Sequence, residues 1–104
     1  MVQEYEVIVI GAGPAGLSAG IFVARQRTSC LIISKDLGGQ LNLIPKLENY
    51  PGTIMSSGPL IAKTLENQFF TFHGEMVYDT VQQIHESESG LTVKTFRSEY
   101  VAKA

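Results

Sequence analysis

The sequence predicts a mixed α/β fold with a strand–helix–strand unit, a second helix and a three-stranded meander. Three observations support this class. A β-branched run at residues 5–10 ends in glycine, residues 14–25 repeat apolar side chains at helical spacing, and short β-type runs separated by turn residues follow Gly74. The 104 residues, 44% hydrophobic and 17% charged, have the length and composition of one small globular domain.

The strand–helix–strand unit is predicted over residues 5–33. The run at residues 5–10 is typical of a parallel strand buried on both faces, and the apolar run at 30–33 predicts its neighbour. Between them, Pro14 suits the first turn of a helix, and Arg25 and Arg27 complement the helix dipole near its end. The crossover that joins the two strands is expected to be right-handed.

A long loop, a helix and four short strands are predicted for the rest of the chain. Residues 34–57 show no period and contain glycine and proline breaks, which favours a loop with a functional role. The second helix opens at Gly58, with Ser56 or Ser57 as its cap, and stops near His73. Four short strands, the last three forming the meander, are expected at residues 76–78, 80–85, 91–96 and 100–104.

Charge, hydropathy and cysteine content argue against several classes of function. Eight basic and ten acidic residues give a net charge of −2, without the basic patch of proteins that bind nucleic acid or anionic membranes. The apolar run Val7–Ile10 is too short to span a bilayer, and a cytoplasmic location is expected. Cys30, the only cysteine, is interpreted as a buried packing thiol. No metal-ligand spacing occurs, and neither His73 nor His85 is expected to be catalytic.

A glycine-rich turn follows the first predicted strand and opens the first helix. It has the G-x-G-x-x-G form and reads Gly11-Ala12-Gly13-Pro14-Ala15-Gly16. Gly11 permits the tight turn, Gly13 lets the backbone approach a diphosphate, and Gly16 lets helix and strand pack closely. Free N–H groups at the positive end of the helix dipole favour an anion there. The turn therefore predicts a Rossmann-like dinucleotide site; by itself it would serve FAD or NAD.

The residue expected to hold the adenosine ribose is less well defined by the pattern. An acidic residue normally follows the third glycine by about 20 positions, which favours Asp36. Asp36 lies beyond the predicted strand end, where Ser34 and Lys35 stand instead. A Ser34 hydroxyl could bond a ribose hydroxyl and Lys35 could approach a phosphate, or all three could be solvated loop residues.

Other motifs resemble low-molecular-weight thioredoxin reductases, of the thioredoxin reductase-like family of class II pyridine nucleotide-disulfide oxidoreductases. The resemblance rests on Leu37-Gly38-Gly39-Gln40-Leu41, Glu48-Asn49-Tyr50-Pro51-Gly52, Ser57-Gly58-Pro59-Leu60, Glu75-Met76-Val77-Tyr78-Asp79 and Ser98-Glu99-Tyr100-Val101-Ala102-Lys103-Ala104. With the glycine turn, these segments cover nearly the whole chain at spacings that match the family. The resemblance implies a flavoprotein whose cofactor is FAD.

The resemblance also implies which residues meet the cofactor. In the family the glycine turn holds the FAD diphosphate, the Gly-Gly-Gln loop passes along the ribityl chain and flavin, and the asparagine lies near the isoalloxazine. Carried over, the contacts besides the turn are Gly38, Gly39, Gln40 and Asn49, with backbone near Thr80 and Val81 at the adenine. The amides of Gln40 and Asn49 can bond flavin atoms without adding charge, and ordinary loop capping is the alternative for both.

The family continues beyond the matched region with an NADPH domain that carries Cys-x-x-Cys. Residues 1–104 are therefore expected to form a truncated FAD-binding domain, and NADPH enters only in a complete enzyme, where hydride passes to FAD and then to a disulfide. The alternatives are a fragment of a related ferredoxin-NADP reductase, a non-catalytic dinucleotide-binding module or an inactive remnant. Without its usual neighbour, the strand Val7–Ile10 would expose an apolar edge, so self-association or a partner chain is expected there.

Overall fold

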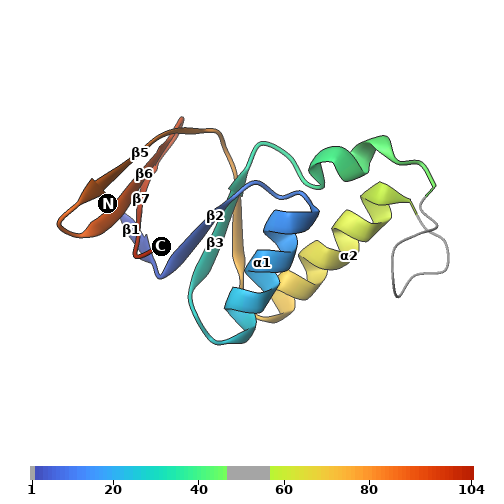
Figure 1. The fold of residues 1–104 in the computed structure, drawn as a ribbon, viewed down its shortest axis with the longest axis horizontal. Helices are drawn as coiled ribbons and strands as arrows, with labels where there is room; N and C mark the ends of the chain where they lie inside the picture. The colour runs from blue at the N-terminus through green and yellow to red at the C-terminus, as the bar shows by residue number, and fades with distance from the viewer. Residues whose placement is uncertain (1, 47–56) are drawn as a thin grey trace.

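A computed structural model describes residues 2–46 and 57–104 of the chain. Two sheets lie next to each other along a long axis of 47 Å (Figure 1). The parallel sheet has the order β2-β3-β4, and the second sheet has the order β1-β7-β6-β5. The elements are β1 (Gln3–Tyr5), β2 (Val7–Ile10), α1 (Pro14–Arg25), β3 (Cys30–Ser34), the 3₁₀ helix η1 (Gly39–Leu43), α2 (Gly58–Thr71), β4 (Glu75–Tyr78), β5 (Val81–Ser87), β6 (Gly90–Thr95) and β7 (Glu99–Ala102).

Strand β3 is buried on both faces, which explains its continuous apolar sequence. Cys30 and Ile32 pack with α1 and α2, whereas Leu31 and Ile33 pack with Tyr5, Val93 and Tyr100 of the second sheet. Strands β2 and β4 pair in parallel with β3 on either side, so the predicted strand–helix–strand unit is confirmed. The carboxyl ends of all three strands therefore meet at one edge of this sheet.

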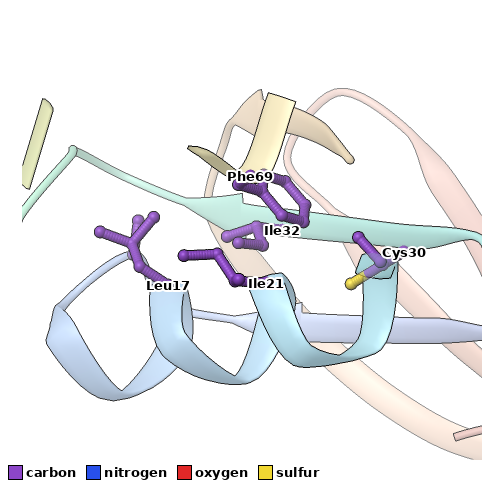
Figure 2. Packing of buried hydrophobic residues seen from close by; sticks show 7 residues of the cluster. Leu17, Ile21, Cys30, Ile32 and Phe69 are labelled. Atoms are coloured by element: carbon purple, nitrogen blue, oxygen red, sulfur yellow. The ribbon is translucent and has the colours of Figure 1, made fainter. Parts of the chain in front are cut away.

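The helices pack against the parallel sheet through close contacts that need a small residue on α1. A side chain at Gly20 would place its Cβ 2.8 Å from Cδ1 of Ile32. Phe69 of α2 is fully buried against this group, with Leu17 and Ile21 of α1 (Figure 2). Of the two serines predicted as candidates, Ser57 caps α2, and its hydroxyl accepts a hydrogen bond from the Leu60 N–H at 3.2 Å.

The interpretation of Cys30 as a packing residue is confirmed. The side chain lies in the helix-facing core at the start of β3 (Figure 2), and the residue is 2% exposed. Burial raises the pKa of its thiol to about 11, because the thiolate would lose its hydration there. The thiol is therefore protonated at neutral pH.

The single strand predicted at residues 5–10 is wrong, because the chain changes sheets at Glu6. Strand β1 pairs in parallel with β7, with Glu4 opposite Val101, whereas β2 belongs to the other sheet. The Glu6 N–H donates to Ser29 Oγ at 2.8 Å instead of joining either ladder. Glu6 is the one charged residue between Tyr5 and Ile10, and it marks the break that the prediction of a single strand passed over.

Strand β2 is an edge strand whose outer side is paired only near its start among the described residues. The Ile8 N–H donates to the Ala104 carbonyl at 2.9 Å, while Ile10 is 50% exposed. The antiparallel pairs β5–β6 and β6–β7 confirm the predicted meander. Within residues 2–46 and 57–104, neither helix is long and apolar enough to cross a membrane.

Candidate functional site

The glycine turn joins the carboxyl end of β2 to the first turn of α1, as the sequence predicts. The Gly11 N–H donates to the Ile33 carbonyl at 2.8 Å, and Gly11 then adopts a φ of +104°, which favours glycine. A Cβ at Gly16 would overlap the carbonyl oxygen of Gly11 and lie 3.5 Å from Val9 Cγ1. Helix and strand therefore approach each other more closely than a side chain at position 16 would allow.

The first turn of α1 presents N–H groups that donate to no other group of residues 2–46 and 57–104. Gly13 is the N-terminal cap and makes no side-chain cap bond, and the first bond within the helix runs from the Leu17 N–H to the Gly13 carbonyl at 2.9 Å. Within the described part of the chain, the N–H groups of Gly13, Ala15 and Gly16 have no protein acceptor, and Pro14 carries none. Three donors thus remain at the positive end of the helix dipole.

Ser34 supports this turn from the end of β3. Its Oγ accepts a hydrogen bond from the Ala12 N–H at 3.1 Å and donates to the Asp36 carbonyl at 2.7 Å. The hydroxyl proton is therefore already used within the chain. Ser34 is better placed to hold the glycine turn than to bond a ribose hydroxyl. Its support of the turn depends on tertiary contacts and has no local sequence signal.

The Gly-Gly-Gln loop docks on the glycine turn through its backbone. The Gly38 N–H donates to the Ala12 carbonyl at 2.7 Å, and a Cβ at Gly39 would lie 3.3 Å from the Cα of Gly13. Gly38 and Gly39 have positive φ values of 99° and 53°. The two glycine segments that the sequence singled out therefore form one continuous structure.

Two cavities flank the glycine turn, and Ile10 and Gly11 line both of them. The first, the loop-side cavity, has a volume of about 440 Å³. Its other lining residues are Gly13, Pro14, Ala15, Gly16, Gln40, Leu41 and Ile44. The cavity thus brings the helix N-terminus and the Gln40 segment to the same surface.

The second, the meander-side cavity, has a volume of about 310 Å³ and lies where the three parallel strands end. Besides Ile10 and Gly11, it is lined by Ile33, Ser34, Lys35, Asp36, Asp79, Thr80 and Val81. The same cavity is thus lined by the three candidates for the ribose contact, residues 34–36, and by Thr80 and Val81, which were expected at the adenine. In open α/β sheets this carboxyl edge is where ligands bind.

Asp79 also lines the meander-side cavity, although it was not among the predicted site residues. Its side chain is only 4% exposed although it carries a carboxylate. Burial acts to raise the pKa of this carboxyl, but hydrogen bonds from Thr95 and from the Thr80 and Arg97 N–H groups, with the Arg97 charge, hold it below its usual value. Its position directly after a predicted apolar strand was the sequence feature that could have identified it as a site residue.

One expected site residue lies outside the described residues, and the two histidines lie away from the glycine turn. Asn49 belongs to residues 47–56, which the structure does not describe. His73 lies at the opposite edge of the parallel sheet, and His85 is exposed on β5. Among the described residues no group of three His, Cys, Asp or Glu side chains could hold a metal ion.

Comparisons with known proteins point to the same cofactor class. Residues 6–43 match the family model described as an FAD binding domain. The chain is 34% identical over 101 residues to the thioredoxin reductase of Bacillus subtilis (strain 168), covering 96% of this chain and 32% of that protein. The thioredoxin reductase of Treponema pallidum (strain Nichols) is 38% identical over 104 residues, covering 98% and 34% of the two chains.

Solved structures show that the similarity extends to the fold. The thioredoxin reductase of Streptococcus pyogenes superposes with a TM-score of 0.92 at 36% identity, covering 99% of this chain and 34% of that chain. That of Lactococcus lactis gives a TM-score of 0.90 at 30% identity, covering 96% and 33%. The chain thus spans about a third of the length of these relatives. In sequence and in fold, it corresponds to the FAD-binding portion of the thioredoxin reductase-like family.

Proposed function

We propose that this chain binds FAD across its glycine turn, with the diphosphate at the N–H groups of Gly13, Ala15 and Gly16. The observation that carries the proposal is that these three donors lack a protein acceptor among the described residues and line the loop-side cavity, which shares Ile10 and Gly11 with the meander-side cavity. An elongated ligand with a central anion fits this arrangement, because its two ends can enter two cavities that share Ile10 and Gly11 in their walls.

Each cavity suits one half of such a ligand. The meander-side cavity would take the adenosine, with Thr80 and Val81 beside the adenine and Lys35 or Asp36 near the ribose and phosphates. The loop-side cavity would take the ribityl chain, with Gln40 of its lining offering an uncharged amide. Gly38 and Gly39 line neither cavity, and their contact with the ligand is proposed by resemblance alone. Asn49 is proposed for the flavin end by resemblance alone.

The role of the chain in a complete enzyme is to bind and orient the flavin. When bound, FAD supplies the ring system that accepts and passes on an electron pair. We propose that residues 1–104 form part of the FAD-binding domain of a cytoplasmic disulfide reductase that draws on NADPH. Because Cys30 is the only cysteine and is buried, the disulfide that is reduced would lie outside this chain.

Comparing three nucleotides tests the proposed cofactor directly. The purified 104-residue chain is titrated with FAD, NAD and NADP, and binding is followed by flavin fluorescence for FAD and by calorimetry for all three. Saturable binding of FAD that is at least about tenfold tighter than that of NAD or NADP is expected. A folded chain that binds NAD more tightly would favour a nicotinamide-binding domain, and one that binds none would favour an inactive remnant.

We also propose that the outer edge of β2 pairs with a second copy or a partner chain. Ile10 is 50% exposed at this edge, and the hydrogen bond from the Ile8 N–H to the Ala104 carbonyl, at 2.9 Å, supports the proposal that backbone groups of this edge are open to pairing. Light scattering of the unaltered chain is expected to give a mass above that of a monomer, and an Ile10→Lys substitution should lower it. A monomeric unaltered chain with an open β2 edge would contradict this proposal.

A further inference from the structure

Asp79 follows the last residue of β4 and contributes to the wall of the meander-side cavity. Its N–H donates to the Ser34 carbonyl at 2.9 Å, which continues the parallel pairing beyond the end of β4. Asp79 is thereby held beside the end of β3, while its carboxylate, with an exposed fraction of 4%, is almost completely removed from water. A buried carboxylate needs hydrogen bonds that offset its lost hydration.

Both carboxylate oxygens receive such bonds from the chain itself. Oδ1 accepts the Thr80 N–H at 2.7 Å, and Oδ2 accepts the Arg97 N–H at 3.2 Å and lies 3.6 Å from Arg97 Nε. The Arg97 guanidinium also donates to the Tyr78 carbonyl. Asp79 therefore ties the passage from β4 to β5 to the turn between β6 and β7.

The segment that this carboxylate holds is the one proposed to meet the adenine. Thr80 and Val81 line the same cavity as Ser34, Lys35 and Asp36. The Thr80 carbonyl accepts the Phe96 N–H at 3.0 Å. Because both oxygens of Asp79 already accept bonds from Thr80 and Arg97, the carboxylate is poorly placed to bind a ribose hydroxyl directly. Its contribution is to fix the shape of the cavity.

We propose that Asp79 is a positioning residue that holds Thr80 and Val81 in place to receive the adenosine half of the cofactor. The inference rests on the proposed binding of FAD and deepens it, because it assigns one buried carboxylate to one half of the ligand. Loss of the carboxylate should weaken ligands that contain adenosine and spare ligands that lack it.

Glu66 offers a matched control in the same chain. Its side chain is 5% exposed, and it accepts hydrogen bonds from Lys63 Nζ at 2.8 Å and from the Tyr78 hydroxyl at 2.7 Å. It lies on α2 and does not line either cavity. Replacing it also removes a buried, hydrogen-bonded carboxylate, so it reports the general loss of stability without the loss of the Thr80 contact.

The test compares the affinities of the unaltered chain, Asp79→Ala, Asp79→Asn and Glu66→Ala for FAD, ADP and FMN. Folding of each variant is first checked by circular dichroism and urea denaturation. In Asp79→Ala, FAD and ADP are expected to bind about tenfold more weakly, whereas the affinity for FMN stays within about twofold. Asp79→Asn should lose less, because its amide oxygen can still accept the Thr80 N–H. Glu66→Ala should show no difference between ADP and FMN.

The outcomes separate this inference from the proposed function. If the unaltered chain binds neither FAD nor ADP, the proposed function fails and the inference fails with it. If the unaltered chain binds both, and folded Asp79→Ala binds them equally well or loses FMN to the same extent, only the inference is overturned. Two Asp79 variants that both fail to fold would also overturn it, because the carboxylate would then serve the fold as a whole.

Discussion

The two edges of the parallel sheet differ in what they leave available to a ligand. The larger cavity, about 590 Å³, lies at the amino edge, where Arg25, Arg27 and His73 line it. There the helix ends are closed by their own chain, since the Arg27 N–H donates to the Ala24 carbonyl and the His73 N–H to the Phe70 carbonyl, both at 2.9 Å. The carboxyl edge has smaller cavities, but it presents N–H donors that have no acceptor among the residues that the structure describes.

This difference shows that free hydrogen-bonding groups identify the candidate site better than cavity size. At the carboxyl edge, the N–H groups of Gly13, Ala15 and Gly16 have no acceptor within the described residues, and the dipole of α1 adds to their attraction for an anion. At the amino edge, the same dipole favours cations, which agrees with Arg25 in the last turn of α1. Substitutions at the two edges should therefore have different consequences.

The largest effect is expected for Gly16→Ala at the carboxyl edge. The added Cβ would overlap the Gly11 carbonyl oxygen, which is a backbone atom and cannot rotate away as a side chain could. The free energy of unfolding should fall by about 3 kcal/mol or more, measured by urea denaturation. An unfolding free energy equal to that of the unaltered chain would mean that the turn and β2 are not packed as closely as described.

Gly13→Ala should separate binding from folding at the same turn. Gly13 has a φ of −78°, which alanine adopts readily, and the added Cβ would lie 4.0 Å from the Gly38 carbonyl oxygen. The unfolding free energy should change by less than about 0.5 kcal/mol, while FAD binds about tenfold more weakly or worse. Titration by flavin fluorescence measures the second effect. Unchanged affinity would show that the diphosphate does not lie against Gly13.

Ser34→Ala tests the support of the turn from β3. The substitution removes the acceptor of the Ala12 N–H and the donor to the Asp36 carbonyl. We expect the unfolding free energy to fall by about 1 kcal/mol and the affinity for FAD to fall a few-fold, through loss of order in the turn. If stability is retained and only affinity falls, Ser34 instead contacts the ligand directly.

Arg27→Gly changes the amino edge and should raise the free energy of unfolding, whereas the substitutions above lower it or leave it unchanged. Arg27 has a φ of 63°, a left-handed conformation that glycine adopts without the strain of a Cβ. The unfolding free energy should rise by about 0.5 kcal/mol, because part of the relief is offset by the greater freedom of glycine in the unfolded chain. The affinity for FAD should not change. A loss of FAD binding would place the ligand at the wrong edge.

The smallest expected effect is a change in how stability depends on pH. It comes from the thiol of Cys30, at the amino end of β3, and does not extend to neutral pH. Its pKa rises from 9.0 to about 11 on folding, so between these values the folded state binds the proton and the unfolded state has lost it. Stability should therefore fall as the pH rises above about 9, and Cys30→Ala should reduce this fall. Urea denaturation at pH 8 and pH 10 measures how far the free energy of unfolding falls in the unaltered chain and in Cys30→Ala. An equal fall in both proteins would contradict the burial of the thiol.

Much of the fold follows from local sequence patterns, whereas the contacts that shape the site do not. The apolar run of β3, the position of Pro14 and the cap Ser57 each have a local signature, and all three were predicted. The break at Glu6 was missed, because it depends on the pairing of β1 with β7, about 95 residues away in the sequence. The hydrogen bonds of Ser34 and Asp79 were missed for the same reason.

The central claim is that FAD binds at the carboxyl edge through the N–H groups of the glycine turn. Amide chemical shifts of the isotope-labelled chain, recorded during titration with FAD, test it most directly. Saturable shifts are expected at Gly13, Ala15 and Gly16, and none around Arg27 and His73. Shifts confined to the amino edge, or no shifts in a folded chain at saturating FAD, would contradict it.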